Sequence, residues 1–70
     1  MAVSYKKLWI LLIEKDMKKT DLRIQSGIST GALAKLGRNE NVNTEVLAKI
    51  CKTLNCDISD IMEMVPDDKE

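Results

Sequence analysis

Apolar residues recur every three or four positions along this chain, always in short segments that compact turn signals separate. This spacing is typical of amphipathic helices, because residues three or four apart share one face of a helix. No segment shows the alternation that is typical of a half-buried strand. We therefore expect a chain built only from short helices.

Five helices account for these segments. They are expected at about 5–15, 18–25, 30–37, 44–54 and 58–62. Suitable N-cap residues precede four of them, namely Ser4, Ser29, Asn43 and Asp57. Gly27 and Asn55 are suited to end the second and fourth helices in the left-handed conformation. The fourth helix has the widest apolar face and should lie at the centre of the core; that face consists of Val46, Leu47, Ile50, Cys51 and Leu54.

Length and composition favour one small soluble domain. The chain has 70 residues, of which 44% are hydrophobic and 31% are charged, and this balance is typical of a globular protein rather than a disordered segment. We expect a single domain over 1–70, with a core at about 4–65 and an acidic tail at 66–70. The longest apolar run, 8–13, is too short to span a membrane, and we expect a cytoplasmic protein.

The charges are balanced but unevenly distributed. The formal net charge is zero, which counts against general attraction to nucleic acid. Basic residues nevertheless concentrate in the middle of the chain, at Lys18, Lys19, Arg23, Lys35 and Arg38. Acidic residues gather towards the end, at Asp57, Asp60, Glu63, Asp67, Asp68 and Glu70. A basic face and an acidic end can therefore coexist in a neutral protein.

Nothing in the sequence predicts a metal site, a cofactor or a catalytic centre. The chain contains no histidine, and its two cysteines do not form a CxxC pair. We expect Cys51 and Cys56 to be buried free thiols, because a free cysteine behaves as a small hydrophobic residue. No arrangement for nucleophilic or acid-base catalysis is present. We therefore expect a binding protein rather than an enzyme.

The segment 20–36 predicts a helix, a glycine-containing turn and a second helix. Its apolar anchors and turn glycine are Leu22, Gly27, Ile28, Leu33 and Leu36. This spacing resembles the phage repressor and Cro-like (XRE) family of helix-turn-helix transcriptional regulators, and the resemblance extends from about Tyr5 to Met64. It implies an all-α, compact five-helix domain that binds DNA and acts as a transcriptional repressor.

The resemblance also implies which residues meet DNA. In such a motif the second helix enters the major groove, while the first lies across the sugar-phosphate backbone. Residues directed at base edges are then Thr30, Gly31, Ala34 and Lys35. Residues placed at phosphates are Lys18, Lys19, Thr20, Arg38 and Asn39. Lys35 is the best single candidate, since a lysine can donate to guanine O6 and N7. Alternatively, the lysines only provide surface charge that keeps the protein soluble.

Three features depart from the family pattern. Arg23 replaces a small residue in the middle of the second helix, and Ser26 replaces a large apolar residue before the turn glycine. We expect Ile24 to supply part of the missing apolar contact through a slight rotation of that helix. The ion pair that many members form between the first and third helices has no counterpart, because Leu12 and Gly37 occupy the matching positions.

Two further expectations concern partners. A regulator of this size usually doubles its site by two-fold symmetry, so we expect a homodimer. The candidate surface is the apolar set Trp9, Ile13, Met62, Met64 and Val65; alternatively, the C-terminal segment folds back over Trp9 and closes the core of the monomer.

The competing function is a protein-interaction module, such as an antitoxin or adaptor, that keeps the fold without strong DNA binding.

Overall fold

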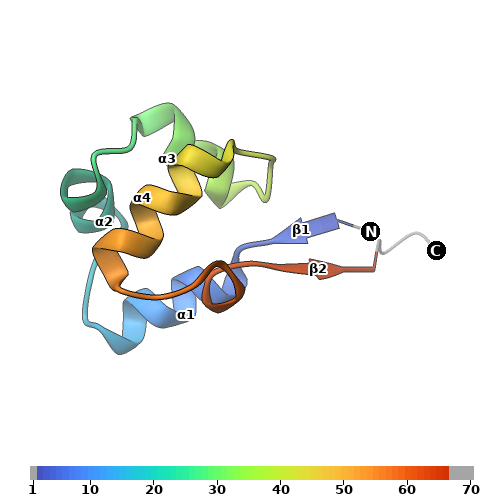
Figure 1. Cartoon of the computed structure of the whole chain (residues 1–70), viewed down its shortest axis with the longest axis horizontal. Coiled ribbons are helices and arrows are strands. Elements are labelled where there is room, and N and C mark those ends of the chain that lie inside the picture. The colour runs from blue at the N-terminus through green and yellow to red at the C-terminus, as the bar shows by residue number, and fades with distance from the viewer. Residues whose placement is uncertain (1, 67–70) are drawn as a thin grey trace.

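The computed structural model describes residues 2–66 (Figure 1). In chain order its elements are β1 (Ala2–Ser4), α1 (Lys6–Glu14), α2 (Lys19–Ser26), α3 (Thr30–Gly37), α4 (Thr44–Leu54), the 3-10 helix η1 (Ile58–Asp60) and β2 (Glu63–Val65). Except for Pro66, the predicted acidic tail lies outside the described residues. Four of the five predicted helices are therefore α-helices within 2–66.

The prediction of a fifth helix at 58–62 is wrong, because a single 3-10 turn takes its place. The Asp57 carboxylate accepts from the Ile58 amide at 2.8 Å, and the Asp60 carboxylate accepts from the Asp57 amide at 2.9 Å. The Ile61 amide then closes the turn by donating to the Ile58 carbonyl at 3.0 Å. Asp57 is thus the predicted cap, but the helix ends after three residues and the chain becomes extended.

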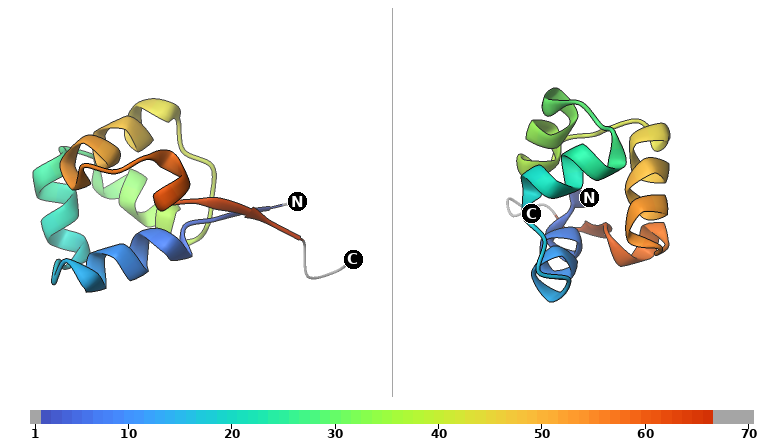
Figure 2. Two further views of the ribbon diagram at one scale, coloured as in Figure 1. Left: turned by 60° about the horizontal axis from the view of Figure 1, so that its bottom comes forward. Right: turned by 90° about the vertical axis from the view of Figure 1, so that its left-hand side faces the viewer.

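The expectation of a purely helical chain is also wrong. β1 pairs with β2 in an antiparallel two-stranded sheet, in the register Ala2 with Val65, Val3 with Met64 and Ser4 with Glu63. The sheet projects from the helices, so the two ends of the described chain lie side by side (Figures 1 and 2). Because Ser4 belongs to β1, Tyr5 is the N-cap residue of α1, in place of the predicted Ser4.

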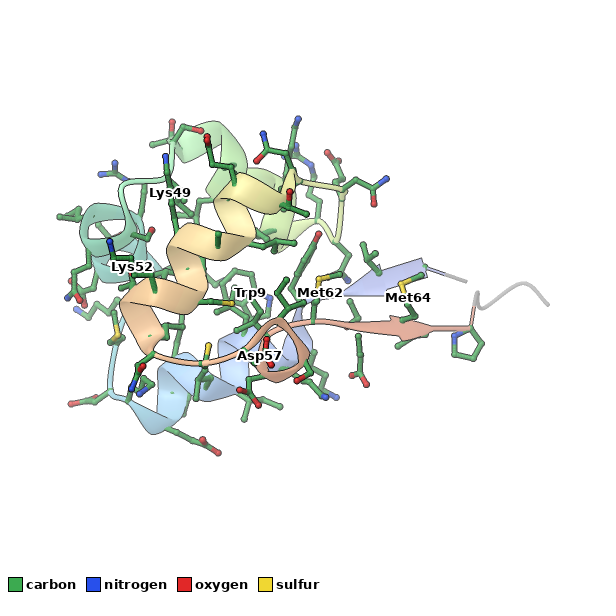
Figure 3. All side chains as sticks on the ribbon, viewed as in Figure 1. Trp9, Lys49, Lys52, Asp57, Met62 and Met64 are labelled. Carbon is green, nitrogen blue, oxygen red and sulfur yellow. The ribbon has the colours of Figure 1, made fainter. Side chains whose placement is uncertain are left out.

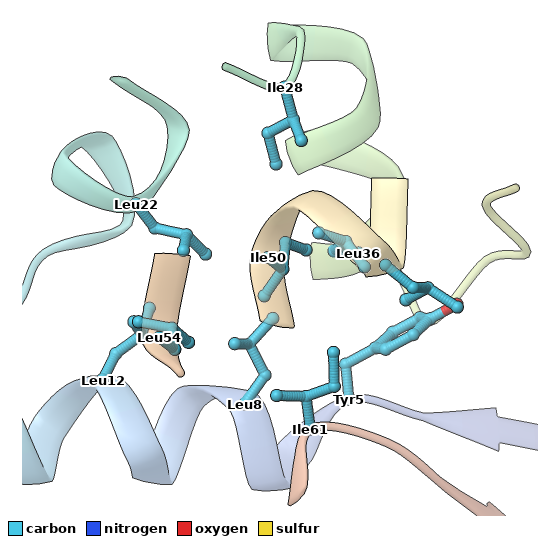
Figure 4. Close-up of a cluster of buried hydrophobic side chains, with 10 residues drawn as sticks. Tyr5, Leu8, Leu12, Leu22, Ile28, Leu36, Ile50, Leu54 and Ile61 are labelled. Atoms are coloured by element: carbon cyan, nitrogen blue, oxygen red, sulfur yellow. The ribbon is translucent and has the colours of Figure 1, made fainter. Parts of the chain in front are cut away.

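One hydrophobic core joins the helices (Figure 4). Its buried side chains are Tyr5, Leu8, Leu12, Leu22, Ile28, Leu36, Leu47, Ile50, Leu54 and Ile61. α4 supplies three of them and contacts α2 and η1, which confirms its predicted central position. No helix among the described residues is long and apolar enough to cross a membrane.

The predicted helix ends and free thiols are largely confirmed. Gly27 ends α2 with φ 77° and Asn55 ends α4 with φ 53°, both in the left-handed region. Cys51 and Cys56 are free, although they are half-buried rather than fully buried. Burial raises the pKa of the Cys51 thiol to about 11, and it also raises the pKa of Cys56.

Candidate nucleic-acid interface

α2 and α3 form the predicted helix-turn-helix. The turn between them, 27–29, begins with Gly27 in the left-handed conformation and ends with Ser29, whose hydroxyl accepts from the Ala32 amide at 3.0 Å. Leu22 on α2, Ile28 in the turn and Leu36 on α3 are all buried in the core. These three anchors hold both helices on the core, and this leaves one side of each in solvent.

α2 is not rotated in the way that the sequence suggested. Ile24 is 64% exposed, whereas Leu22 is fully buried, so the expectation that Ile24 replaces a missing apolar contact is wrong. The Ser26 hydroxyl donates to the Leu22 carbonyl at 2.6 Å. Because that bond satisfies the hydroxyl within its own helix, Ser26 is tolerated where the family places a large apolar residue.

The predicted base-reading residues share the solvent face of α3. Thr30, Gly31, Ala34 and Lys35 are all exposed, whereas Ala32 and Leu33 are half-buried and Leu36 is buried. A Cβ built at Gly31 would lie 3.8 Å from the Ser29 hydroxyl oxygen and would meet nothing closer. The packing of the protein itself therefore does not require glycine at this position.

The start of α2 presents the first group of predicted phosphate residues. Lys18, Lys19 and Thr20 are exposed there, and the first amides of a helix have no partner within the helix. The Asp21 carboxylate accepts from the Lys18 amide at 3.1 Å. The Lys19 ammonium lies over the Trp9 ring, 4.5 Å from its centroid. Lys19 therefore has an aromatic neighbour that sequence reasoning did not assign to it.

The segment after α3 carries the second group, and both of its members have partners within the chain. Arg38 Nε donates to Glu40 Oε2 at 2.7 Å. That pair lowers the pKa of Glu40 and raises the pKa of Arg38. Asn39 has φ 55°, and its Oδ1 accepts from the Tyr5 amide at 3.1 Å. The sequence analysis did not identify Tyr5 and Glu40 as the partners of Asn39 and Arg38. Only the short spacing between Arg38 and Glu40 could have indicated an ion pair.

A family model described as the Cro/C1-type HTH DNA-binding domain matches residues 7–67. The chain belongs to this family. The solved structure "Crystal structure of transcriptional regulator VanUg, Form II" is 56% identical to it, with a TM-score of 0.91, over 94% of this chain and 88% of that one. A comparison with curated proteins found no match. The family suggested by the anchors of 20–36 is thus confirmed.

The predicted dimer residues of this Cro/C1-type domain lie in two places. Trp9 and Ile13 line an apolar groove of about 400 Å³ together with Leu12, Met17, Lys18 and Lys19. Met64 and Val65 belong to β2, whereas Met62 is half-buried against the core (Figure 3). Trp9 is also half-buried against the core. The most exposed members are therefore Ile13, at 77%, and Met64, at 52%.

Proposed function

We propose that this protein regulates transcription, as a repressor, by inserting α3 into the major groove of a specific DNA site. The observation that carries this proposal is that α3 turns a continuous solvent face outward while its opposite side is anchored in the core. Family membership supports it, and so does the similarity to a solved transcriptional regulator.

Three residues on that face are proposed to read bases, and a fourth is proposed to allow their approach. The Lys35 ammonium donates to guanine O6 or N7, and the methyl groups of Thr30 and Ala34 contact thymine methyl groups. Gly31 allows the backbone of α3 to approach DNA closely, since nothing within the protein explains a missing side chain there.

Phosphate contacts are proposed for residues that precede α3 in the chain and for one residue that follows it. Lys18, Lys19 and Thr20 lie at the start of α2, where free amides and basic side chains suit phosphate oxygens. Arg38 lies just after α3 and is also exposed. These contacts fix the register of α3 on the duplex, and the bases supply the specificity.

Selection of binding sites from a random duplex library tests this proposal. We expect one motif to be enriched, and we expect Lys35→Ala to weaken binding to it by about 1–3 kcal/mol while relaxing the preference at one base. Lys49→Ala, which removes an exposed lysine from α4 instead, is the matched control. Failure to enrich any motif would contradict sequence-specific binding. Equal losses on selected and arbitrary duplex would make Lys35 a phosphate contact.

The competing function is a protein-interaction module. The zero net charge and the groove lined by Trp9, Ile13 and Met17 favour it. Such a module would bind duplex weakly and would show little dependence of affinity on salt.

The proposal includes a homodimer on a near-palindromic site, with half-sites about ten base pairs apart. Of the five predicted dimer residues, Ile13 and Met64 are the most exposed, and Met62 is a poor target for mutation because it packs on the core. Sedimentation equilibrium at tens of micromolar should show a dimer for the wild type and a monomer for Ile13→Ser/Met64→Ser. A monomeric wild type that also binds the selected site as a single copy would contradict the dimer.

A further inference from the structure

Tyr5 connects the start of α1 to the segment that follows α3. Its ring is buried, with 1% of the residue exposed. Its amide donates to Asn39 Oδ1 at 3.1 Å, and its hydroxyl donates to the Glu40 carbonyl at 2.9 Å. We name Tyr5, Asn39 and Glu40 the Tyr5 clasp. Through it, residues that are 34 and 35 positions apart in the chain are held together by two hydrogen bonds.

The far side of the clasp is attached to the last turn of α3. The Asn39 amide donates to the Leu36 carbonyl at 3.2 Å, and the Glu40 amide donates to the Lys35 carbonyl at 2.9 Å. Asn39 adopts the left-handed conformation that this sharp return requires. Asn39, Glu40 and the end of α3 therefore behave as one unit, and Tyr5 fixes the position of that unit.

The near side of the clasp lies where β1 ends and α1 begins. As a result, the clasp also sets the position of the β-sheet relative to α3. A hollow of about 520 Å³ lies between them, and it is lined by Ala2, Val3 and Met64 from the strands and by Lys35, Asn39, Glu40 and Asn41 from α3 and its loop. Lys35, the proposed guanine contact, thus borders the sheet.

We propose that Asn39 is a positioning residue for α3. An amide N–H can bond only to the oxygen of the Asn39 side chain, so the bond from Tyr5 fixes which way that side chain is turned. The clasp then holds the last turn of α3, and with it Lys35, in the orientation that reads bases. This inference rests on the proposed DNA-binding function.

Two variants separate positioning from direct contact. Tyr5→Phe removes the hydroxyl and keeps the ring, and because Tyr5 is buried it cannot affect DNA by touching it. Asn39→Gly removes the amide group and tolerates the left-handed backbone. Asn41→Gly, in the same exposed loop, is the matched control. Binding is measured on a duplex selected by the wild type and on an arbitrary duplex of equal length, with each variant first shown to be folded by circular dichroism.

We expect Tyr5→Phe and Asn39→Gly each to weaken binding to the selected duplex by about 2- to 10-fold, the range that one hydrogen bond supplies. Neither variant should change the affinity for the arbitrary duplex. Asn41→Gly should bind both duplexes as tightly as the wild type does. The double variant should lose less than the product of the single losses, since both changes open the same clasp. Multiplicative losses, equal losses on both duplexes or an unaffected Tyr5→Phe would overturn the proposal.

Hydrogen exchange of the Tyr5 amide in the free protein tests the clasp without DNA. We expect protection in the wild type and exchange about 2- to 10-fold faster in Asn39→Gly. An unprotected Tyr5 amide in the wild type would overturn the clasp itself. Wild-type protein that shows this protection and yet binds no duplex would refute the proposed function and the positioning role together, while leaving the clasp as a structural feature.

Discussion

Arg38 and Glu40 form an exposed side-on ion pair. Arg38 Nε donates to Glu40 Oε2 at 2.7 Å and Nη2 donates to Oε1 at 3.4 Å, so both carboxylate oxygens are engaged. The hydrogen bond from Arg38 lowers the pKa of Glu40, so the carboxylate keeps its charge in more acidic solution than a free glutamate does. A DNA phosphate that approaches Arg38 must therefore compete with Glu40 for the guanidinium.

Replacing Glu40 with glutamine should strengthen DNA binding. Glu40→Gln releases the guanidinium of Arg38 and removes a negative charge beside the proposed interface. We expect affinity for any duplex to rise severalfold at low salt, and the slope of log affinity against log salt to steepen by up to about one unit. Fluorescence anisotropy titrations at several salt concentrations measure both quantities. Glu14→Gln removes the same charge from the end of α1 and should have a smaller effect; equal effects would exclude a specific role for Glu40.

Gly31→Ala should separate stability from binding. A Cβ at Gly31 would make only an ordinary contact with the Ser29 hydroxyl oxygen at 3.8 Å. Because alanine is the better helix former and Gly31 lies in the first turn of α3, we expect the free energy of unfolding to rise by up to about 1 kcal/mol. If the backbone of α3 approaches DNA at Gly31, the added methyl group should weaken binding to the selected duplex. Urea unfolding and anisotropy titration on the same preparation check the two effects. A variant that is more stable and binds as well as the wild type would remove Gly31 from the interface.

Trp9 should report the engagement of Lys19. Trp9 is the single tryptophan, and the Lys19 ammonium lies over its ring. A phosphate that draws the ammonium away changes the surroundings of the indole, so we expect the tryptophan emission to change at saturating duplex. Lys19→Met should abolish this change and reduce the salt slope by about one unit, whereas Lys18→Met should keep the emission change. A full emission change in Lys19→Met would show that Trp9 responds to something else.

The stability of the fold should fall in alkali because of Cys51. Burial raises the pKa of Cys51 from 9.0 to about 11, so the unfolded chain loses this proton at lower pH than the folded chain does. The contribution is fully present below about pH 9 and is lost progressively as the pH rises towards about 11. Urea unfolding across this range should show a decline that is smaller in Cys51→Ala. The same decline in both proteins would assign the effect to other groups.

The thiol of Cys51 should also react slowly while the protein is folded, because the thiolate is the reactive form. Alkylation by iodoacetamide at pH 8 should accelerate strongly when the chain is unfolded in urea. Equal rates in the two states would contradict the raised pKa.

Sequence reasoning succeeded where the determinants are local. The apolar face of α4, the Ser29 and Asn43 caps and the left-handed Gly27 and Asn55 all act within one or two helical turns. Their positions could therefore be predicted from spacing alone, and with them the helix-turn-helix.

The failures have non-local causes. β1 and β2 have three residues each, which is too short for alternation to be visible, and they pair across almost the whole chain. The clasp joins Tyr5 to Asn39 through a side chain and a turn that no local pattern specifies. The orientation of Ile24 depended on how α2 packs, and the internal bond of Ser26 removed the reason for a rotation.

We propose that the exposed basic side chains around α2 and α3 contact DNA phosphates. The most direct test is the salt dependence of wild-type binding to duplex DNA, since each phosphate contact contributes about −0.9 to the slope of log affinity against log salt. With Lys18, Lys19 and Arg38 engaged, we predict a linear plot with a slope of about −2.7 or steeper. A flat plot would contradict these phosphate contacts and would favour a protein-interaction module.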